Sequence, residues 1–148
     1  YLAGPVRFDD DGGKSWREEI KEQYEDDEFI EFKDPLDKYN IRVEDLEVVG
    51  GSESGSGEVS VSEIVNGDKE MIDQCNALFV GYSPVRSIGT PMEVMYAYER
   101  DYPIGIWLRD PESTVEDLSP WYRYHTDAVK QRYEDVLYRL DRVRLNRE

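Results

Sequence analysis

A carboxylate that follows a turn of small residues is the feature of this chain best suited to chemistry. Residues 87–93 read Ser-Ile-Gly-Thr-Pro-Met-Glu and come between an apolar segment and an expected helix. Such a turn offers unpaired backbone N–H groups and hydroxyls to an anion or a sugar. Glu93 lies near the start of the helix, where the helix dipole favours its ionised form. An ionised carboxylate beside a sugar can attack the anomeric carbon or stabilise positive charge that develops there. A glutamate that only stabilises its own helix is the alternative.

Two further polar residues are candidates to act with Glu93. Asp68 lies near the end of the preceding expected helix, beside Lys69 and Glu70. Taken alone, it is more simply an exposed acid on a helix. Tyr1 begins the segment Tyr-Leu-Ala-Gly-Pro, which is expected to end a first strand. Its hydroxyl either donates a hydrogen bond to a carboxylate or packs on the sheet.

The elements that must position these residues alternate between strands and helices. Apolar runs at residues 77–82 and 103–108 are typical of buried parallel strands, and residues 29–32 predict another strand. Ser15 and Glu18 have the spacing of a capping box for a first helix. Helices are expected at about residues 16–26, at 59–71, from Pro91 to about Arg100, and from Ser119-Pro120 along the rest of the chain. The Gly- and Ser-rich stretch at residues 50–57 predicts a flexible loop.

This order of elements predicts an α/β fold. We expect a Rossmann-like, flavodoxin-like parallel sheet flanked by helices, in a single domain over residues 1–148. Ligands of such sheets bind beyond the carboxyl ends of the strands. The Gly4-Pro5 turn and residues 83–89 both belong at that edge, so the two loops are expected to form one crevice.

The composition limits the partners and the compartment. The chain has 18 Lys and Arg against 34 Asp and Glu, a formal net charge of -16, which argues against binding to a nucleic-acid backbone. Only 6 of the cations are Lys, so the surface is typical of a halophile's high-salt cytoplasm or of an acidic mesophilic protein. A single cysteine, Cys75, fits a reducing compartment, and we expect a cytoplasmic protein. The sequence shows no signal peptide and no membrane-spanning apolar run.

Three motifs together resemble the nucleoside 2-deoxyribosyltransferase family, which includes the nucleoside 5′-monophosphate N-glycosidases. The order of elements agrees over most of the chain, and the detailed match covers residues 1–5, residues 68–78 (Asp68, Ile72, Cys75, Asn76, Ala77 and Leu78) and residues 89–97 (Gly89, Thr90, Glu93 and Ala97). The resemblance implies that Glu93 attacks C1′ and forms a glycosyl-enzyme intermediate. It implies that Asp68 holds a sugar hydroxyl and assists the departing base, and that Tyr1 orients Glu93. Asn76 stands where many relatives have an acid.

One position separates the branches of this family. The transferases typically have an aspartate six residues before the glutamate, where it binds the 5′-hydroxyl, and here that residue is Ser87. A carboxylate would repel a 5′-phosphate, whereas a hydroxyl and neighbouring N–H groups accept one. We therefore expect a hydrolase that releases the base from a (deoxy)nucleoside 5′-monophosphate. The alternatives are a transferase that exchanges bases on unphosphorylated deoxynucleosides and a non-catalytic nucleotide-binding module.

Further candidates surround these motifs. Gly4 and Gly89 belong to the two ligand-facing turns, and Arg7 and Arg86 are placed to pair with a phosphate or to lie on the surface. Trp16 either stacks on a base or packs in the core. In related enzymes the segment before the last helix reaches a neighbouring subunit's active site, which makes Ser119 a candidate. A homodimer or larger homo-oligomer is expected. The lone histidine, His125, has no cluster of metal ligands in the sequence, so we expect no metal and no cofactor.

Overall fold

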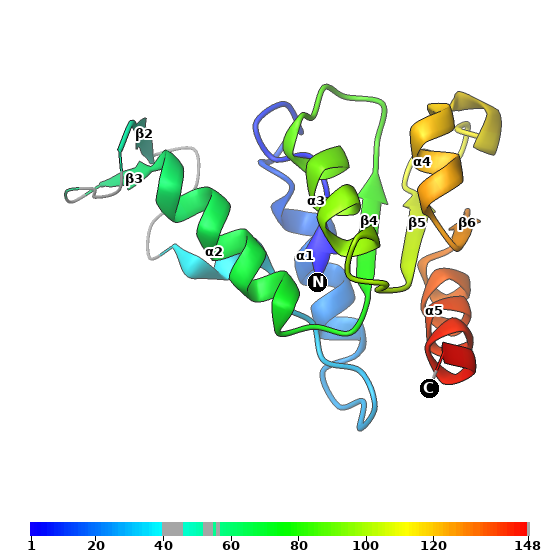
Figure 1. Cartoon of the computed structure of the whole chain (residues 1–148). Coiled ribbons are helices and arrows are strands. Elements are labelled where there is room, and N and C mark those ends of the chain that lie inside the picture. The colour runs from blue at the N-terminus through cyan, green and yellow to red at the C-terminus, as the bar shows by residue number, and fades with distance from the viewer. Residues whose placement is uncertain (40–45, 52–54, 56, 148) are drawn as a thin grey trace.

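A parallel sheet forms the centre of the structure. The computed structural model describes residues 1–39, 46–51, 55 and 57–147. Four strands lie in the order β1 (Leu2–Ala3), β4 (Leu78–Tyr82), β5 (Ile104–Leu108) and β6 (Ala128–Lys130), and every neighbouring pair is parallel. A separate two-stranded parallel sheet joins β2 (Glu47–Val49) to β3 (Glu58–Ser60). The predicted Rossmann-like α/β fold is confirmed (Figure 1).

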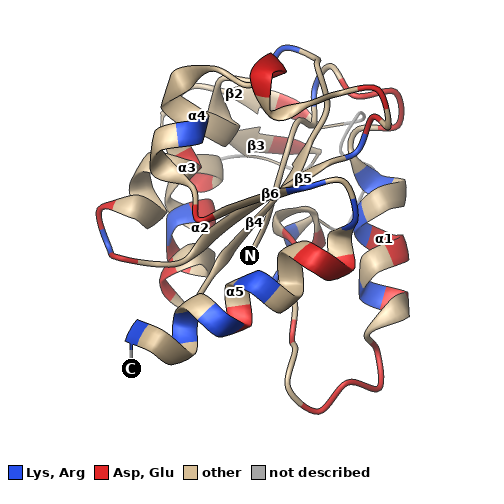
Figure 2. Cartoon of the chain, turned by 90° about the vertical axis from the view of Figure 1, so that its right-hand side faces the viewer, with Lys and Arg blue, Asp and Glu red and all other residues tan. Residues whose placement is uncertain are grey.

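Helices cover both faces of the sheet. α1 (Lys14–Gln23) and α5 (Tyr133–Arg147) lie on one face, and α2 (Val61–Asp73), α3 (Gly89–Tyr98) and the short α4 (Pro120–His125) lie on the other (Figures 1 and 2). Two 3-10 turns, η1 (Pro35–Lys38) and η3 (Val115–Asp117), lie in the connections. α2 extends away from the sheet and has β2 and β3 at its N-terminal end (Figure 1).

The alternation of side chains along β4 explains the two layers of core. Leu78 and Val80 face one way and pack in a cluster with Ile72 of α2 and Val94 of α3. Phe79 faces the other way and packs in a cluster that includes Trp16, Ile20, Val136 and Leu140 of α1 and α5. A strand that is apolar at every position is therefore buried on both faces, as the sequence predicts for a parallel sheet.

The start of α1 differs from the prediction. The helix begins at Lys14, its N-cap is Gly13, and no capping box forms at Ser15. Gly13 adopts a φ of 75°, in the left-handed region that favours glycine. The carboxylate of Asp11 accepts hydrogen bonds from the backbone N–H groups of Gly13, Lys14 and Ser15, so it satisfies donors at the start of the helix in place of a capping serine. A complete capping box occurs instead at α2, where Ser60 and Glu63 bond each other's backbone N–H groups.

The strand expected at residues 29–32 is absent. Phe29 is 94% exposed, and the backbone N–H groups of Phe29 and Ile30 both donate to the carboxylate of Asp27 rather than to a strand. Beyond this segment, the N–H of Leu2 donates to the carbonyl of Lys33. Residues 31–34 therefore pass the edge of β1 without forming a ladder.

The prediction of a single long helix after Ser119 is also wrong. Ser119 does cap a helix, because its hydroxyl accepts from the N–H of Trp121, but α4 ends at His125. Ala128 and Val129 then belong to strand β6 and pair with Gly105 and Ile106 of β5. Their apolar character reflects a buried strand and not the stripe of a helix. The last helix, α5, begins only at Tyr133.

The acidic composition is distributed over the fold. Figure 2 shows Asp and Glu on helices and loops around the molecule, with Lys and Arg interspersed on α1 and α5. No helix in the described ranges has an apolar stretch of the length that crosses a bilayer. Half of the Gly- and Ser-rich stretch at residues 50–57, expected as a flexible loop, falls outside the described residues.

Trp16 fixes how α1 sits on the sheet. Its ring packs against Phe79 and Trp107 at centroid distances of 6.3 and 6.2 Å, and the side chain is only 4% exposed. It lies against two glycines at the carboxyl ends of β1 and β4. A Cβ added at Gly81 would come 2.6 to 2.8 Å from atoms of the ring, and one at Gly4 would come 2.9 Å from it. The close approach of α1 to the sheet therefore requires that no side chain stand at these positions.

We predict that Gly81→Ala destabilises the protein by about 1–3 kcal/mol, because the new methyl group overlaps the Trp16 ring, which the surrounding core holds in place. Urea unfolding measures the effect. Gly50→Ala is the matched control, since no atom lies within 4 Å of a Cβ at that exposed position, and it should change the free energy of unfolding by less than about 0.5 kcal/mol. Equal effects of the two substitutions would contradict this account of Trp16.

Candidate active site

Glu93 lies in the second turn of α3 and faces inward. The residue is half-buried, and its Oε2 atom is buried without a hydrogen-bond partner in the structure. Gly89, one turn earlier, leaves room beside it, because a Cβ there would come 3.9 Å from Glu93 Oε1. A buried polar atom without a partner carries a cost in stability, and it is also an atom free to bind or attack a ligand.

The protonation of Glu93 follows from its surroundings. Burial raises the pKa of this carboxyl to about 8, and the negative charge of Asp68 acts in the same direction. The Tyr1 hydroxyl, Arg17 and Lys38 oppose the rise in pKa. The protonated form therefore predominates at neutral pH in the absence of a ligand. A carboxyl group with so large a shift is typical of a functional site.

Tyr1, the residue before β1, is the group at the sheet that acts on Glu93. It is 5% exposed, and its hydroxyl is buried and completes no hydrogen bond. Burial raises the pKa of Tyr1, and the charges of Glu93 and Asp68 raise it further. The phenol therefore stays neutral and keeps a proton to donate. The structure thus brings together Tyr1, which precedes β1, Asp68 of α2 and Glu93 of α3; their catalytic roles stay a prediction.

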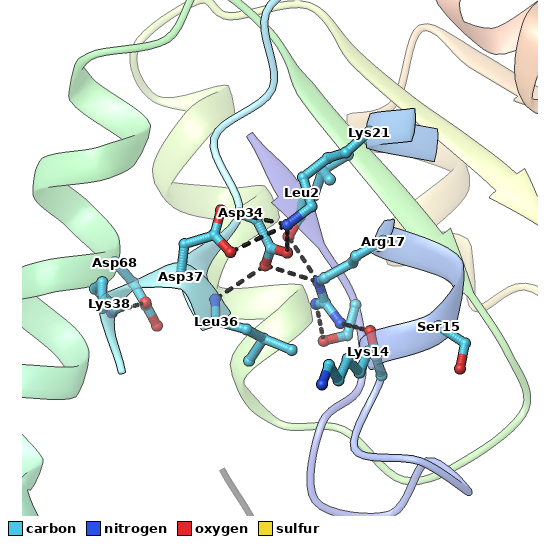
Figure 3. A network of polar contacts seen from close by, with 12 residues as sticks. Leu2, Lys14, Ser15, Arg17, Lys21, Asp34, Leu36, Asp37, Lys38 and Asp68 are labelled. Atoms are coloured by element: carbon cyan, nitrogen blue, oxygen red, sulfur yellow. Dashed lines mark hydrogen bonds and ion pairs between the residues drawn. The ribbon is translucent and has the colours of Figure 1, made fainter. Parts of the chain in front are cut away.

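Asp68 is not the solvated helix acid that its local sequence indicates. Its side chain is half-buried and forms an ion pair with Lys38 of η1 (Figure 3). Asp34 precedes η1 and caps it by accepting from the N–H of Leu36, with Pro35 at the first position. The sequence analysis missed Lys38. A Pro-Leu-Asp-Lys turn gives no local sign that its lysine contacts a residue 30 positions later.

A second cation near the site, Arg17, was also missed. The side chain is 1% exposed and donates hydrogen bonds to the carbonyl oxygens of Leu2, Gly13 and Gly4 at 3.4, 2.7 and 3.1 Å. Its Nε lies 3.6 Å from the carboxylate of Asp34, which is 3% exposed. The available sequence signal is an arginine between Trp16 and Ile20 on the apolar face of α1. Figure 3 shows the guanidinium between the start of α1 and the end of β1.

A chain of ion pairs connects Arg17 with solvent. Asp34 also pairs with Lys21 at 2.8 Å, and Lys21 pairs with the exposed Asp37 at 3.0 Å (Figure 3). The buried charges of Arg17 and Asp34 therefore compensate each other and are connected to groups in water.

A cavity of about 480 Å³ opens beside α3 at the carboxyl end of β4. Ser87 stands at its rim, where its hydroxyl bonds the Thr90 hydroxyl at 2.8 Å and accepts from the Thr90 N–H at 3.3 Å. The hydroxyl of Ser83 also lines the cavity and is buried without a partner. The lining residues are Pro5, Val80, Tyr82, Ser83, Val85, Arg86, Ser87, Thr90, Pro91, Ser119, Trp121 and Tyr122.

Tyr122 connects this cavity with Glu93. Its ring packs edge-on against Tyr82 with the centroids 5.9 Å apart, and both side chains line the cavity. Burial raises the pKa of Tyr122 to about 12, and the charges of Tyr82 and Glu93 add to the rise. Glu93 itself does not line the cavity, but its charge acts on Tyr122, which does. Thr90 and Pro91 of the first turn of α3 also line the cavity; the N–H of Thr90 is bonded to Ser87 and Pro91 has no N–H, which leaves the N–H of Gly89.

Several sequence candidates lie elsewhere or act differently. Trp16 is in the core and is not available to stack on a base. Gly4 contributes a buried carbonyl to Arg17. Arg7 and Arg86 both lie near the ring of Phe8, at 5.3 and 5.7 Å, but of the two only Arg86 lines the cavity. Ser119 lines the cavity of its own chain, so its contact with a neighbouring subunit stays a prediction.

Metal ligands do not gather in the described part of the chain: its His, Cys, Asp and Glu residues form no group of three or more that could hold an ion. His125 stacks on Trp121 at the exposed end of α4. A larger cavity of about 750 Å³ lies at the opposite end of the sheet, between residues 27–33 and α5. Tyr1 lines it but Glu93 and Asp68 do not, it lies away from the Ser87 turn, and we assign it no chemistry.

We predict that Glu93→Gln stabilises the protein more as the pH rises. The folded state holds a proton on Glu93 up to about pH 8, whereas the ordinary value for a glutamate is 4.5, so the unfolded chain binds fewer protons between these limits and wild-type stability falls with rising pH. Glutamine does not titrate. The difference in the free energy of unfolding should therefore increase by about 2–4 kcal/mol between pH 5 and pH 9, as measured by urea unfolding.

The exposed Glu99, at the end of the same helix, supplies the control. The free energy of unfolding of Glu99→Gln should differ from that of the wild type by the same amount at pH 5 and at pH 9. A constant difference for Glu93→Gln as well would show that Glu93 is not held protonated by the fold.

No protein-family model matches this chain, and no curated protein matches it in sequence.

Proposed function

We propose that this protein hydrolyses the N-glycosidic bond of (deoxy)nucleoside 5′-monophosphates with Glu93 as the nucleophile. One observation carries the proposal: Glu93 has a buried carboxyl oxygen without a hydrogen-bond partner, Tyr1 and Asp68 both act on it, and the first turn of its helix lines a cavity together with Ser87. The resemblance of the motifs to the nucleoside 2-deoxyribosyltransferase family supports the same chemistry.

In the first step Glu93 must be ionised. A carboxylate oxygen attacks C1′ of the sugar, the C1′–N bond breaks, and its electron pair leaves with the base, which takes up one proton from solvent. In the second step water attacks C1′ and gives one proton back to solvent, and the bond from C1′ to Glu93 breaks with its electron pair returning to the carboxylate. The products are the free base, the sugar 5-phosphate and the restored carboxylate. Two displacements at C1′ retain its configuration.

Tyr1 and Asp68 prepare Glu93 for this step. The neutral phenol of Tyr1 donates toward the carboxylate, which favours its ionised form and limits its rotation. Asp68 accepts a hydrogen bond from a sugar hydroxyl and holds C1′ in line for attack. As the transition state forms, the sugar becomes positively charged, and the two carboxylates stabilise that charge.

The other end of the cavity suits the 5′-phosphate. The unpartnered hydroxyl of Ser83 and the N–H of Gly89 at the start of α3 supply hydrogen-bond donors, Ser87 adds no negative charge, and Arg86 supplies a positive charge at the rim. In a protein of net charge -16, such local positive potential is needed to attract a nucleotide.

The direct test is to incubate the protein in high salt with nucleosides and their 5′-monophosphates, with and without an acceptor base, and to quantify free base by chromatography. We expect release from monophosphates without an acceptor. Glu93→Ala should lower it by about 10³-fold or more, and wild-type kcat/KM should rise with pH up to about 8 as Glu93 ionises. Products formed only with an acceptor base would indicate a transferase, and binding without turnover would indicate a nucleotide-binding module.

A second prediction concerns Ser87→Asp. Aspartate also caps a helix, so stability should change little, but its charge would face the 5′-phosphate. We expect kcat/KM for monophosphates to fall by about 10–100-fold, with a much smaller change for unphosphorylated nucleosides. Ser87→Ala separates the loss of the hydroxyl from the added charge. Equal losses for both substrates in Ser87→Asp would place the phosphate elsewhere.

A further inference from the structure

Lys38 is the residue that brings a positive charge to Asp68. It is the last residue of η1, and its ammonium pairs with Asp68 Oδ1 on α2 (Figure 3). Both side chains are largely buried, at 20% and 23% exposed. Lys38 also lies 5.5 Å from the ring of Tyr39. Burial raises the pKa of Tyr39 to about 12, and the charges of Asp68 and Glu63 add to the rise.

α2 leaves space for this lysine. Gly67 stands in the interior of the helix, where glycine is less favourable than alanine. A Cβ at Gly67 would come 3.1 Å from Lys38 Nζ and 3.3 Å from Lys38 Cδ. The side chain of Lys38 therefore passes α2 at Gly67, the residue before Asp68, which has no side chain of its own.

The pair does more than connect η1 with α2, because its charges reach Glu93. The groups that act on Glu93 come from separate parts of the chain: Tyr1 before β1, Arg17 of α1, Lys38 of η1 and Asp68 of α2. The charge of Glu93 in turn acts on Tyr122 of α4. The negative charge of Asp68 disfavours the ionised form of Glu93. Lys38 touches one of them and opposes the rise in the pKa of the other.

We infer that Lys38 is a positioning residue of the active site, which fixes the carboxylate of Asp68 and supplies the counter-charge that lets Asp68 and Glu93 be ionised together. The inference rests on the proposed function for its catalytic consequence. Lys38 does not contact the substrate and acts through Asp68 and Glu93.

Four variants test it. Lys38→Met removes the charge and Lys38→Arg retains it. Gly67→Leu keeps every charge and a strong helix former in α2, but it fills the space that the Lys38 side chain occupies. Lys69→Met is the matched control, because Lys69 is the next residue of α2, is exposed, and lies over Tyr96.

The first readout needs no substrate. Infrared difference spectra follow the carbonyl band of the protonated Glu93 carboxyl, assigned by its loss in Glu93→Gln, as the pH is raised. We expect the midpoint to move up by about one pH unit in Lys38→Met and in Gly67→Leu, and to stay in place in Lys38→Arg and Lys69→Met. In the turnover assay we expect kcat to fall by about 10–100-fold in Lys38→Met and in Gly67→Leu, with a smaller change in KM.

A purely structural role for Lys38 gives a different pattern. Lys38→Met would then lower the melting temperature but leave the Glu93 midpoint and kcat unchanged, which would overturn the inference. If Lys38→Met does not fold, Gly67→Leu decides by the same two readouts. If the wild type releases no base from any substrate, the proposed function fails, while the infrared midpoint still decides the role of Lys38.

Discussion

The buried guanidinium of Arg17 is the interaction on which the active-site end of this fold depends. It joins the end of β1 to the loop before α1 by donating to the carbonyls of Leu2, Gly4 and Gly13, and its charge is matched by the buried Asp34. A neutral side chain in its place would leave those carbonyls unsatisfied and Asp34 as a buried, poorly compensated charge, and such losses destabilise a fold strongly. The same cation lowers the pKa of Glu93. The group that shapes the crevice therefore also adjusts the acidity of the carboxylate within it.

The site shows how a very acidic protein arranges a local balance of charge. The negative charge of Asp68 raises the pKa of Glu93, and two cations from different parts of the chain, Arg17 and Lys38, oppose that effect. The balance is incomplete, because burial still raises the pKa of Glu93 to about 8. Keeping a carboxyl group there lowers stability at neutral and alkaline pH, a cost typical of functional residues. A bound substrate that becomes positively charged at C1′ would shift the balance toward the carboxylate.

The sequence predicted the parts of the fold that local patterns determine. The apolar runs of β4 and β5 and the small-residue turn before α3 were identified correctly. The grouping of Tyr1, Asp68 and Glu93 was implied only by the resemblance of the motifs to a known family, because local sequence makes Asp68 an exposed helix acid. The failures have physical reasons. The aromatic and β-branched residues at 29–32 have strand propensity, but Asp27 takes their N–H groups. Arg17 and Lys38 were missed because a buried cation is recognised by its partners, which lie far away in the sequence.

The hydroxyl of Ser87 is already engaged in the structure, and this bears on how an anion would be held. It bonds Thr90 through both the hydroxyl and the backbone N–H, so it helps to begin α3. The donors left near the cavity are instead the hydroxyl of Ser83 and, in the first turn of the helix, the N–H of Gly89, because the N–H of Thr90 is bonded to Ser87 and Pro91 has none. Under the proposed function, Ser87 would favour a phosphate mainly by not being an acid and by fixing the start of the helix. The selectivity between nucleotide and nucleoside would then depend on the absence of a negative charge at this position, and the affinity on the neighbouring donors.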